Sequence, residues 1–379
     1  AVLTGQVVSR GEAAQVELRL VEVQSGRGLW DGRYSVRPDA AIALENEIAQ
    51  RVVERLRLPV SARTPRLMDP TAHTLYLKGK YQLTKRTKDS LREAQLLFEQ
   101  ALEHDPQQAV LHGGLAEAWA LIGAYSVRSP ADSFPRAIAA ARRALEMDEN
   151  LAEARAVLAL CLFLYDWDWG AAESEFRRVT ESQPGYATGH HWYAEYLMAR
   201  GRSDEAVASL RRAKELDPLS IVIAVDIGRA YYFGRRFKEA RAECQRALDV
   251  SPGLVQAIEC VAMVDLAEGR YQEAIANYRE VIRQGIDAGP PGLMMALSAA
   301  GRQAEAEGEL AKLGHVDRPA VQLILAKGAL GYRDEAFRDL EAARKERSNN
   351  LVYMKTDPRA DRMRKDPRWT AFARLAGVE

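Results

Sequence analysis

The sequence predicts a mainly α-helical protein in which helix–turn–helix units repeat along the chain after a short α/β segment. Two observations lead to this prediction. Ala172, Ala206, Ala240 and Ala274 recur at a spacing of 34 residues, each followed by a large residue four positions later and a small one three positions after that. By contrast, the first 34 residues are predicted to form strands, and within them "AQVELRLVEV" alternates between apolar and polar side chains, which is the period of a β-strand.

Residues 1–57 are predicted to form a partial α/β domain of three antiparallel strands and one helix. In "AQVELRLVEV", Val16, Leu18 and Leu20 share one face, "SGRG" is a turn signal, and "LWDGRY" supplies a further strand. After Pro38, apolar residues recur every fourth position, which indicates a helix. Three short strands and one helix bury one another's apolar faces only partly, so we expect another part of this domain upstream of residue 1.

Three prolines interrupt both periods in "LPVSARTPRLMDP", which predicts a linker at residues 58–70. We expect the repeat array at residues 71–347 and a helical cap at 348–379. A turn precedes the recurring alanine, as in "GRSDEA", "GRRFKEA" and "GRYQEA". Glycine fits the left-handed end of one helix, and glutamate stabilises the first turn of the next. A 34-residue helix–turn–helix period is that of the tetratricopeptide repeat, and about eight units are expected to stack into a right-handed superhelix.

The segments "LYLKGKYQLTKRT", "HHWYAEYLMARGR" and "YMKTDPRADRMRKDPRW" narrow the match further. They resemble a bacterial family of regulatory proteins in which a tetratricopeptide array follows a TolB-like α/β domain, and residues 5–56 resemble the second half of that domain. Family members usually carry an amino-terminal effector: a winged-helix DNA-binding domain, a serine/threonine kinase or an adenylate cyclase. The resemblance implies a carboxy-terminal sensing or docking module, and none of these effectors is present in this sequence.

Composition argues against several classes of protein. Lys+Arg and Asp+Glu are equal at 53 each, which argues against a domain devoted to nucleic acid. The longest apolar run, Ala156–Tyr165, is about half of the ~20 residues that a membrane helix needs. The three cysteines, Cys161, Cys244 and Cys260, are widely spaced, which predicts free thiols. We therefore expect a cytoplasmic location, with the periplasmic part of a membrane-anchored regulator as the alternative.

The segment "GHHWYAEYLMARGRSDEA" contains the side chains best suited to chemistry. Adjacent helix residues such as His190 and His191 point about 100° apart, so they cannot share one metal ion. His191 and Glu195 share a face, but no third ligand type recurs at helical spacing nearby. We expect a hydrogen-bonded pair on the concave face, with contact to a ligand as the alternative, and we predict no metal site and no cofactor.

A partner-binding groove on the concave face is the main functional expectation. A mixture of aromatic, aliphatic and charged side chains suits an extended peptide or a partner helix. Arg229 is the candidate to meet a ligand carboxylate, with pairing to a neighbouring glutamate as the alternative. The predicted lining is Phe163, His191, Glu195, Arg229, Tyr232, Phe233, Glu259 and Met263.

The sequence thus predicts a non-catalytic scaffold that docks a protein or peptide partner, or a second copy of itself, and regulates an upstream effector. A small-ligand sensor is the alternative, and a closed pocket near His191 and Tyr232 would favour it over an open channel. The basic segment Asp357–Trp369 has the charge to touch phosphate, but we expect it to cap the last repeat with Trp369 and Phe372 packed inward. We expect neither direct nucleic acid binding nor a membrane span from this segment.

Overall fold

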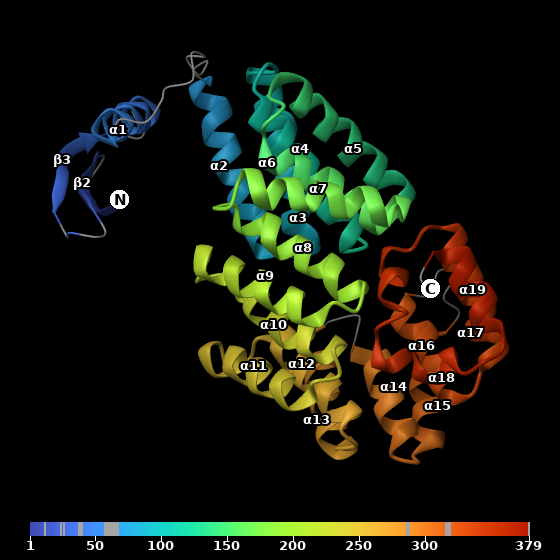
Figure 1. Ribbon diagram of the computed structural model, residues 1–379. Helices are drawn as coiled ribbons and strands as arrows, with labels where there is room; N and C mark the ends of the chain where they lie inside the picture. The colour runs from blue at the N-terminus through green and yellow to red at the C-terminus, as the bar shows by residue number, and fades with distance from the viewer. Residues whose placement is uncertain are drawn as a thin grey trace.

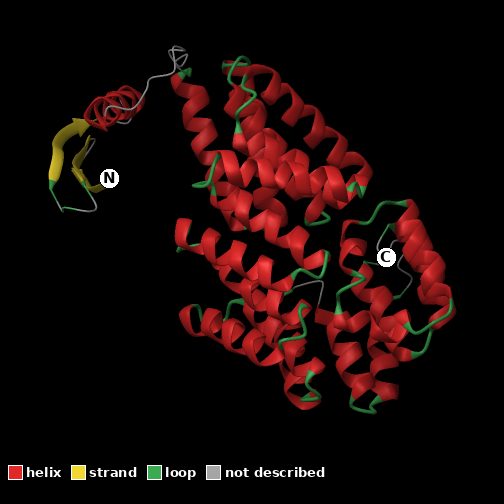
Figure 2. Cartoon of the chain, viewed as in Figure 1, coloured by secondary structure: helices red, strands yellow, loops and turns green. Residues whose placement is uncertain are grey.

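The protein consists of a small antiparallel sheet with one helix, followed by a long array of paired helices (Figures 1 and 2). The structure, a computed structural model, describes residues 1–10, 13–22, 25, 27–36, 41–56, 68–285, 289–314 and 320–377. The predicted fold class is confirmed, because the described chain is mainly helical and begins with a three-stranded antiparallel sheet. No described helix combines the length and the apolar character that crossing a membrane requires.

The sheet has the strand order β1–β2–β3, with antiparallel neighbours. Along β2, Val16, Leu18 and Leu20 are less exposed than the residues between them, as their alternation predicted. Leu20 lies opposite Trp30 of β3, and both side chains are buried. The element bounds are β1 (Val2–Arg10), β2 (Ala13–Val21), β3 (Gly28–Val36) and α1 (Ala41–Leu56).

Two of the sequence predictions for this region fall largely beyond the part of the chain that the structure describes. Residues 37–40, where the helix was expected to begin at Pro38, lie outside the described residues. The predicted linker at 58–70 lies outside them as well, apart from residues 68–70, and α2 begins at Pro70. Upstream completion of the α/β domain stays a prediction.

From Pro70 onward, successive helices pair into eight helix–turn–helix units, the number expected from the sequence. The first helix of the third unit continues into a short π-helical turn, η2 (Leu162–Asp166). The pairs are α2 (Pro70–Lys85) with α3 (Lys88–His104), α4 (Ala109–Ala124) with α5 (Pro130–Met147), α6 (Ala152–Cys161) with α7 (Trp169–Ser182), α8 (Ala187–Ala199) with α9 (Ser203–Leu216), α10 (Ile221–Phe233) with α11 (Phe237–Val250), α12 (Val255–Ala267) with α13 (Tyr271–Arg283), α14 (Gly289–Ala299) with α15 (Gln303–Leu313), and α16 (Val321–Leu330) with α17 (Arg333–Lys345).

The recurring alanines lie at the contacts between paired helices. Ala172, Ala206, Ala240 and Ala274 have no exposed surface, because a methyl group is the largest side chain that this close approach leaves room for. The small residue at this position therefore sets the spacing of each pair, as the period predicted.

The turn before the recurring alanine follows the predicted glycine rule in most units but not in "GRRFKEA". Gly201 and Gly269 adopt left-handed φ values of 76° and 79°. Gly234 has a φ of −78°, and the next residue, Arg235, takes the left-handed conformation with a φ of 60°. A Cβ atom at Gly234 would lie 2.2 Å from the hydroxyl oxygen of Ser203, so this glycine is required by close packing rather than by its φ angle.

After α17 the chain turns back into the concave side of the array, through η3 (Asn349–Tyr353), η4 (Pro358–Ala360), α18 (Asp361–Arg364) and α19 (Arg368–Ala376). We call residues 347–361 the return segment. In Figure 1 the red C-terminal part of the chain faces the green helices of the third and fourth units. The cap predicted from the sequence is therefore only part of the arrangement.

Two sets of contacts hold this C-terminal region. On the last unit, the Arg368 guanidinium lies 4.3 Å from the centre of the Phe337 ring, and Phe372 is buried as expected. In the return segment, the Asn349 amide donates to the carbonyl of Ala124 at 2.8 Å, so it reaches a helix 225 residues earlier. The expected contacts with the last repeat are therefore present, and the region also reaches α4 of the second unit.

The prediction of three free thiols is also wrong. Cys244 of α11 and Cys260 of α12 form a disulfide, and only Cys161 is a free cysteine. Sixteen residues separate the pair in sequence, but α11 and α12 pack side by side and bring the two Cα atoms to 5.8 Å, a normal disulfide separation. The spacing of the cysteines along the chain does not predict this disulfide, because the contact depends on how α11 packs against α12.

Candidate functional site

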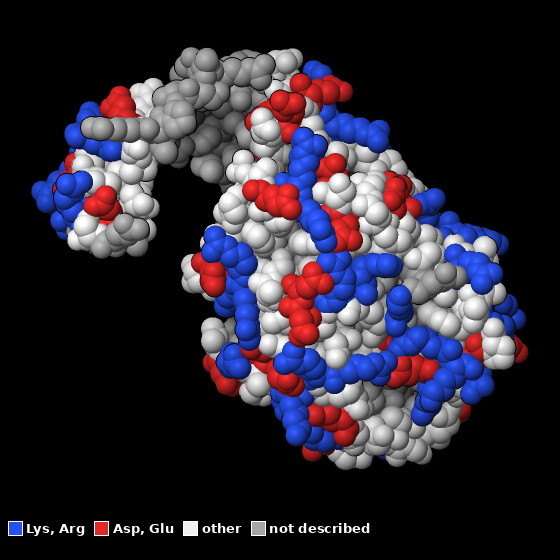
Figure 3. All heavy atoms as spheres, in the orientation of Figure 1, with Lys and Arg blue, Asp and Glu red and all other residues white. Residues whose placement is uncertain are grey.

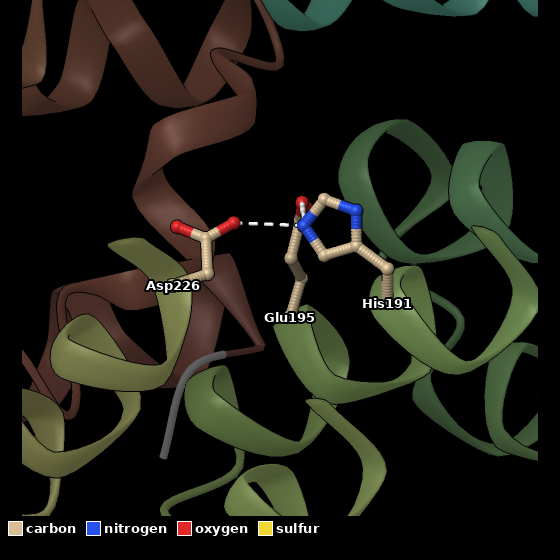
Figure 4. A group of neighbouring side chains, drawn as sticks. All are labelled: His191, Glu195 and Asp226. Carbon is tan, nitrogen blue, oxygen red and sulfur yellow. Dashed lines mark hydrogen bonds and ion pairs between the residues drawn. The ribbon is translucent and has the colours of Figure 1, made fainter. Parts of the chain in front are cut away.

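The densest group of chemically competent side chains lies between the fourth and fifth units. His191 and Glu195 project from α8, and Asp226 projects from α10 toward them (Figure 4). The His191 Nε2 atom lies 2.7 Å from Asp226 Oδ2 and 3.5 Å from Glu195 Oε1. His191 and Asp226 are buried, while Glu195 is partly exposed. We call these three residues the His–Glu–Asp cluster.

Burial and neighbouring charge act in opposite directions on the cluster. Burial lowers the pKa of His191, but the hydrogen bond and the charge of Asp226 outweigh it, so the pKa lies above the ordinary histidine value. Burial raises the pKa of Glu195, and repulsion from Asp226 adds to this effect against the opposing attraction of His191. The arrangement therefore favours a positive charge at its centre.

Arg229 is already engaged by the protein. Its guanidinium donates to Glu259 Oε2 at 3.2 Å and to Asp226 Oδ1 at 3.5 Å. Of the two alternatives that the sequence left open for Arg229, pairing with a neighbouring glutamate is the one found in the structure. Arg229 therefore does not present a free cation to a ligand carboxylate.

A cavity of about 220 Å³ adjoins the cluster on the concave side, and we call it the central cavity. Helices α8, α10, α12 and α16 form part of its wall, and the return segment contributes Tyr353 and Arg359 to its lining. Its charged side chains are the acids Glu195, Asp226, Glu259 and Asp357 and the bases Arg229 and Arg359, so acids outnumber bases. Of the eight predicted lining residues, Glu195, Arg229, Phe233, Glu259 and Met263 line this cavity.

The other predicted lining residues lie elsewhere. Phe163 has no exposed surface, and its ring packs against those of Trp169, Tyr196 and Tyr353, so its assignment to the groove surface is wrong. Tyr232 is 1% exposed and packs against the rings of Phe233 and Phe237. The reason is common to both: the middle of the concave face is filled by packed aromatic rings and by the return segment.

A second cavity, of about 490 Å³, lies between α2, α4, α8 and the loop before α10, and we call it the lateral cavity. His191 lines it, whereas Glu195 and Asp226 line the central cavity, so the cluster separates the two. At its rim Leu219 is 88% exposed and Ile221 is 45% exposed. Inside it, Lys80 Nζ and Glu117 Oε2 form an ion pair at 2.7 Å, with Glu117 buried.

The lateral cavity also contains the half-buried cation Arg86, which makes no hydrogen bond or ion pair with another side chain in the described part of the protein. Sequence reasoning missed Lys80, Arg86 and Leu219, because they lie in the first unit and in an inter-repeat loop, away from the regular 34-residue block. The one available signal was Leu219 itself, an apolar residue directly after Pro218 in a turn.

On the face that Figure 3 shows, basic and acidic side chains lie close together across the array. Many of them pair, as Arg202 does with Glu173 at 2.6 Å and with Glu205 at 2.6 Å. Each surface ion pair of this kind contributes little to stability. Together the pairs balance positive and negative charge on the exposed helix faces.

Comparison with known proteins identifies the repeats. Residues 162–221 match the family model for the tetratricopeptide repeat. Superkiller complex protein 3 of Mus musculus is 29% identical over 239 residues, which cover 62% of this chain and 15% of that protein. Transcriptional regulator HilA of Salmonella typhimurium is 23% identical over 220 residues, which cover 57% of this chain and 39% of HilA. The chain thus spans well under half the length of these relatives.

Among solved structures, a monomeric IFIT1 mutant bound to m7Gppp-AAAA superposes with a TM-score of 0.56 at 16% identity. The match covers 88% of this chain and 76% of the other. At this level of identity the likeness concerns the fold alone. Residues 162–221 thus match the tetratricopeptide repeat, and the chain is similar in part to a transcriptional regulator.

Proposed function

We propose that this chain is the docking module of a longer regulatory protein, and that it binds a short acidic and apolar segment of a partner protein in the lateral cavity. Binding there controls an effector carried elsewhere in the same protein. The observation that carries the proposal is Arg86, a half-buried cation that makes no direct ion pair with another side chain of the described residues, next to two exposed aliphatic side chains.

The chemistry of the lateral cavity selects the occupant. Leu219 and Ile221 offer apolar surface at the rim, where a partner's aliphatic or aromatic side chain loses contact with water on binding. Lys80 and Glu117 form an ion pair, and the other charged residues of the lining are Arg86 and the exposed Asp217, of which Arg86 can bind a partner carboxylate. A segment with an acidic residue beside apolar ones satisfies both features.

The size of the two cavities supports this choice of site. The lateral cavity, about 490 Å³, falls within the 300–1,000 Å³ or so that is typical of ligand-binding clefts. The central cavity, about 220 Å³, is smaller, and the return segment forms part of its lining. A partner segment therefore has room in the lateral cavity, and the middle of the concave face, where the sequence placed the groove, holds the protein's own chain.

The regulatory part of the proposal draws on resemblance. HilA is by its name a transcriptional regulator, and this chain matches only part of its length. We include three further points in the proposal. Residues 1–57 form part of a TolB-like domain, the upstream effector is a winged-helix domain, a kinase or a cyclase, and the repeat array itself is not catalytic. Of the two locations considered, the Cys244–Cys260 disulfide supports the periplasmic one over the cytoplasmic one, because disulfides persist in oxidising compartments.

A second candidate function is supported by the central cavity. It is a partly open pocket lined by Glu195 and Asp226 of the His–Glu–Asp cluster, and it offers a small ligand a recess close to His191. Its volume and its excess of carboxylates fit a small cationic ligand rather than a phosphate or a carboxylate. Self-association, the other partner predicted, draws no specific support from these cavities.

Selection from a random peptide library tests the docking proposal. We expect binders to the wild-type chain to combine aspartate or glutamate with large apolar residues. Arg86→Glu and Leu219→Asp are expected to weaken these binders at least about tenfold, which corresponds to about 1.4 kcal/mol. Selection on the Arg86→Glu variant should shift toward basic peptides.

Matched controls are available among exposed residues that line neither cavity. Val250 is 85% exposed, nearly as much as Leu219, and Arg178 is an exposed arginine of α7. Val250→Asp and Arg178→Glu should leave peptide affinity unchanged. Binders without acidic residues, or equal losses in the control variants, would contradict docking in the lateral cavity.

A further inference from the structure

We propose that the His–Glu–Asp cluster is a binding site for a divalent transition-metal ion, with Zn²⁺ the best fit. The three ligand atoms, one from each side chain, all lie within 4.8 Å of one another. Figure 4 shows the imidazole and both carboxyl groups directed at a common point. This inference does not depend on the docking proposal.

Two of the three separations between ligand atoms are near those around a bound ion, and the Glu195 and Asp226 oxygens lie within 4.8 Å of each other. Zinc–nitrogen and zinc–oxygen bonds of about 2.0–2.1 Å in a tetrahedron separate the ligand atoms by about 3.3 Å. His191 Nε2 and Glu195 Oε1 are 3.5 Å apart, close to this value. His191 Nε2 and Asp226 Oδ2, at 2.7 Å, share a hydrogen bond and separate by about half an ångström when an ion replaces the proton between them.

The surroundings hold the proposed ligands in place. Arg229 donates to Asp226 Oδ1, the oxygen that faces away from the histidine, which orients the carboxylate in the way that supporting residues do in known metal sites. Glu259 balances the charge of Arg229. The cluster itself then has two carboxylates around one imidazole, and a divalent ion neutralises them more completely than a single proton does.

Glu195 supplies a separate argument. In the described part of the protein, its carboxylate contacts a charged or polar side chain only at His191, and at 3.5 Å this is too long for a strong hydrogen bond. A carboxylate that is three-quarters buried without a close partner is costly, and an ion at the common point supplies that partner.

The site has access and an open coordination position. Glu195 and Asp226 line the central cavity, and His191 lines the lateral cavity, so an ion can enter along the concave side. Three protein ligands leave the fourth tetrahedral position to a water molecule or to a small donor molecule in the central cavity. One nitrogen and two oxygen ligands suit Zn²⁺ better than Mg²⁺ or Ca²⁺, which prefer oxygen alone.

Sequence reasoning predicted no metal site because it looked for the third ligand close to the histidines. The third ligand is Asp226, which lies 35 residues after His191 and belongs to the next unit. The stacking of α8 against α10 brings the two together.

Titration of the untagged chain with Zn²⁺ by calorimetry, after removal of metals with a chelator, tests the site. We expect one equivalent to bind to the wild type and to raise its unfolding temperature. His191→Ala and Asp226→Asn should weaken binding by at least about a hundredfold, since the first removes a direct ligand and the second replaces a charged carboxylate with a neutral amide. With Co²⁺ in place of Zn²⁺, the wild type should show the visible absorption of a tetrahedral site.

Two further variants keep the result interpretable. His190 is the matched control, because its Nε2 atom contacts the Pro184 carbonyl at 3.2 Å and lies outside the cluster. His190→Ala should bind as the wild type does. Glu195→Gln keeps the shape of a partly exposed side chain, so it should remain folded and still lose affinity, even where a buried substitution disturbs folding.

The proposal is overturned if the wild type binds no stoichiometric Zn²⁺, or if His191→Ala and Glu195→Gln bind as tightly as it does. It is overturned equally if His190→Ala abolishes binding. In each of these cases, the cluster is a buried pair that shares a proton and has no role as an ion site.

Discussion

Replacing Tyr353 with alanine tests whether the return segment is an integral part of the array. The Tyr353 ring stacks on Phe233 with 5.4 Å between ring centres and meets Phe163 edge-on at 6.1 Å. Two aromatic pairs contribute about 1–3 kcal/mol together beyond their buried area. Loss of burial of a half-buried ring adds about 1 kcal/mol. We therefore expect the free energy of unfolding to fall by about 2–4 kcal/mol.

Equilibrium unfolding in urea, followed by circular dichroism, measures this change. Tyr332→Ala is the matched control, since Tyr332 is 37% exposed and has no aromatic partner among the described rings. Tyr353→Ala should also speed cleavage by trypsin after Arg347 and Lys355, because the return segment loses its anchor. If both variants lose the same stability, and trypsin cleaves them at the same rate, the return segment is not anchored as we describe.

Three further predictions concern the core, the lateral cavity and the disulfide. Phe163→Ala should cost about 3–5 kcal/mol, because it empties a fully buried ring site; a cost below about 1 kcal/mol in the same urea assay would place the ring at the surface. Burial raises the pKa of Glu117, but Lys80 outweighs this effect and holds the pKa below its ordinary value of 4.5, so the pair's contribution is present at neutral pH and is lost as the pH falls below about 4.5. Glu117→Gln should therefore flatten the acid side of a plot of stability against pH, and an unchanged slope would refute the coupling. The Cys244→Ser/Cys260→Ser double variant should lose about 3 kcal/mol, as expected for a closed loop of 16 residues, and equal stability of the two forms would exclude a stabilising disulfide.

The repeat architecture could be predicted because its signals are local. An alanine that contacts the partner helix recurs in every unit, because the two helices of each unit approach each other closely at this position. Ala206 and Ala240 are buried for this reason, and the face of β2 that contains Val16 and Leu18 follows in the same way from a period of two.

The left-handed residue in "GRRFKEA" could not be predicted from the turn pattern of the sequence. Glycine at position 234 and arginine at 235 satisfy the turn pattern in sequence, but Ser203 lies so close that the glycine is needed for space. Arg235 then adopts the left-handed conformation, and Asp361 of the C-terminal region holds its guanidinium through hydrogen bonds of 2.6 and 2.9 Å. The second partner is 126 residues away, and no turn rule includes it.

In the candidate site too, contacts within one helix could be predicted and contacts between units could not. The sequence placed His191 and Glu195 on one face of one helix, because residues four apart on a helix are neighbours. It could not identify Asp226 as the group that completes the cluster, nor Arg86 as the cation of the lateral cavity, because both come from other units.

The sequence by itself therefore determined the helical repeat, the number of units and the small residues that recur at the helix–helix contacts. Only the tertiary structure decided that the chain folds back into its own concave face, where Tyr353 covers the position predicted for a partner. The physical reason is distance along the chain: helix periodicity is fixed over about four residues, whereas the path of the superhelix depends on the sum of all unit contacts.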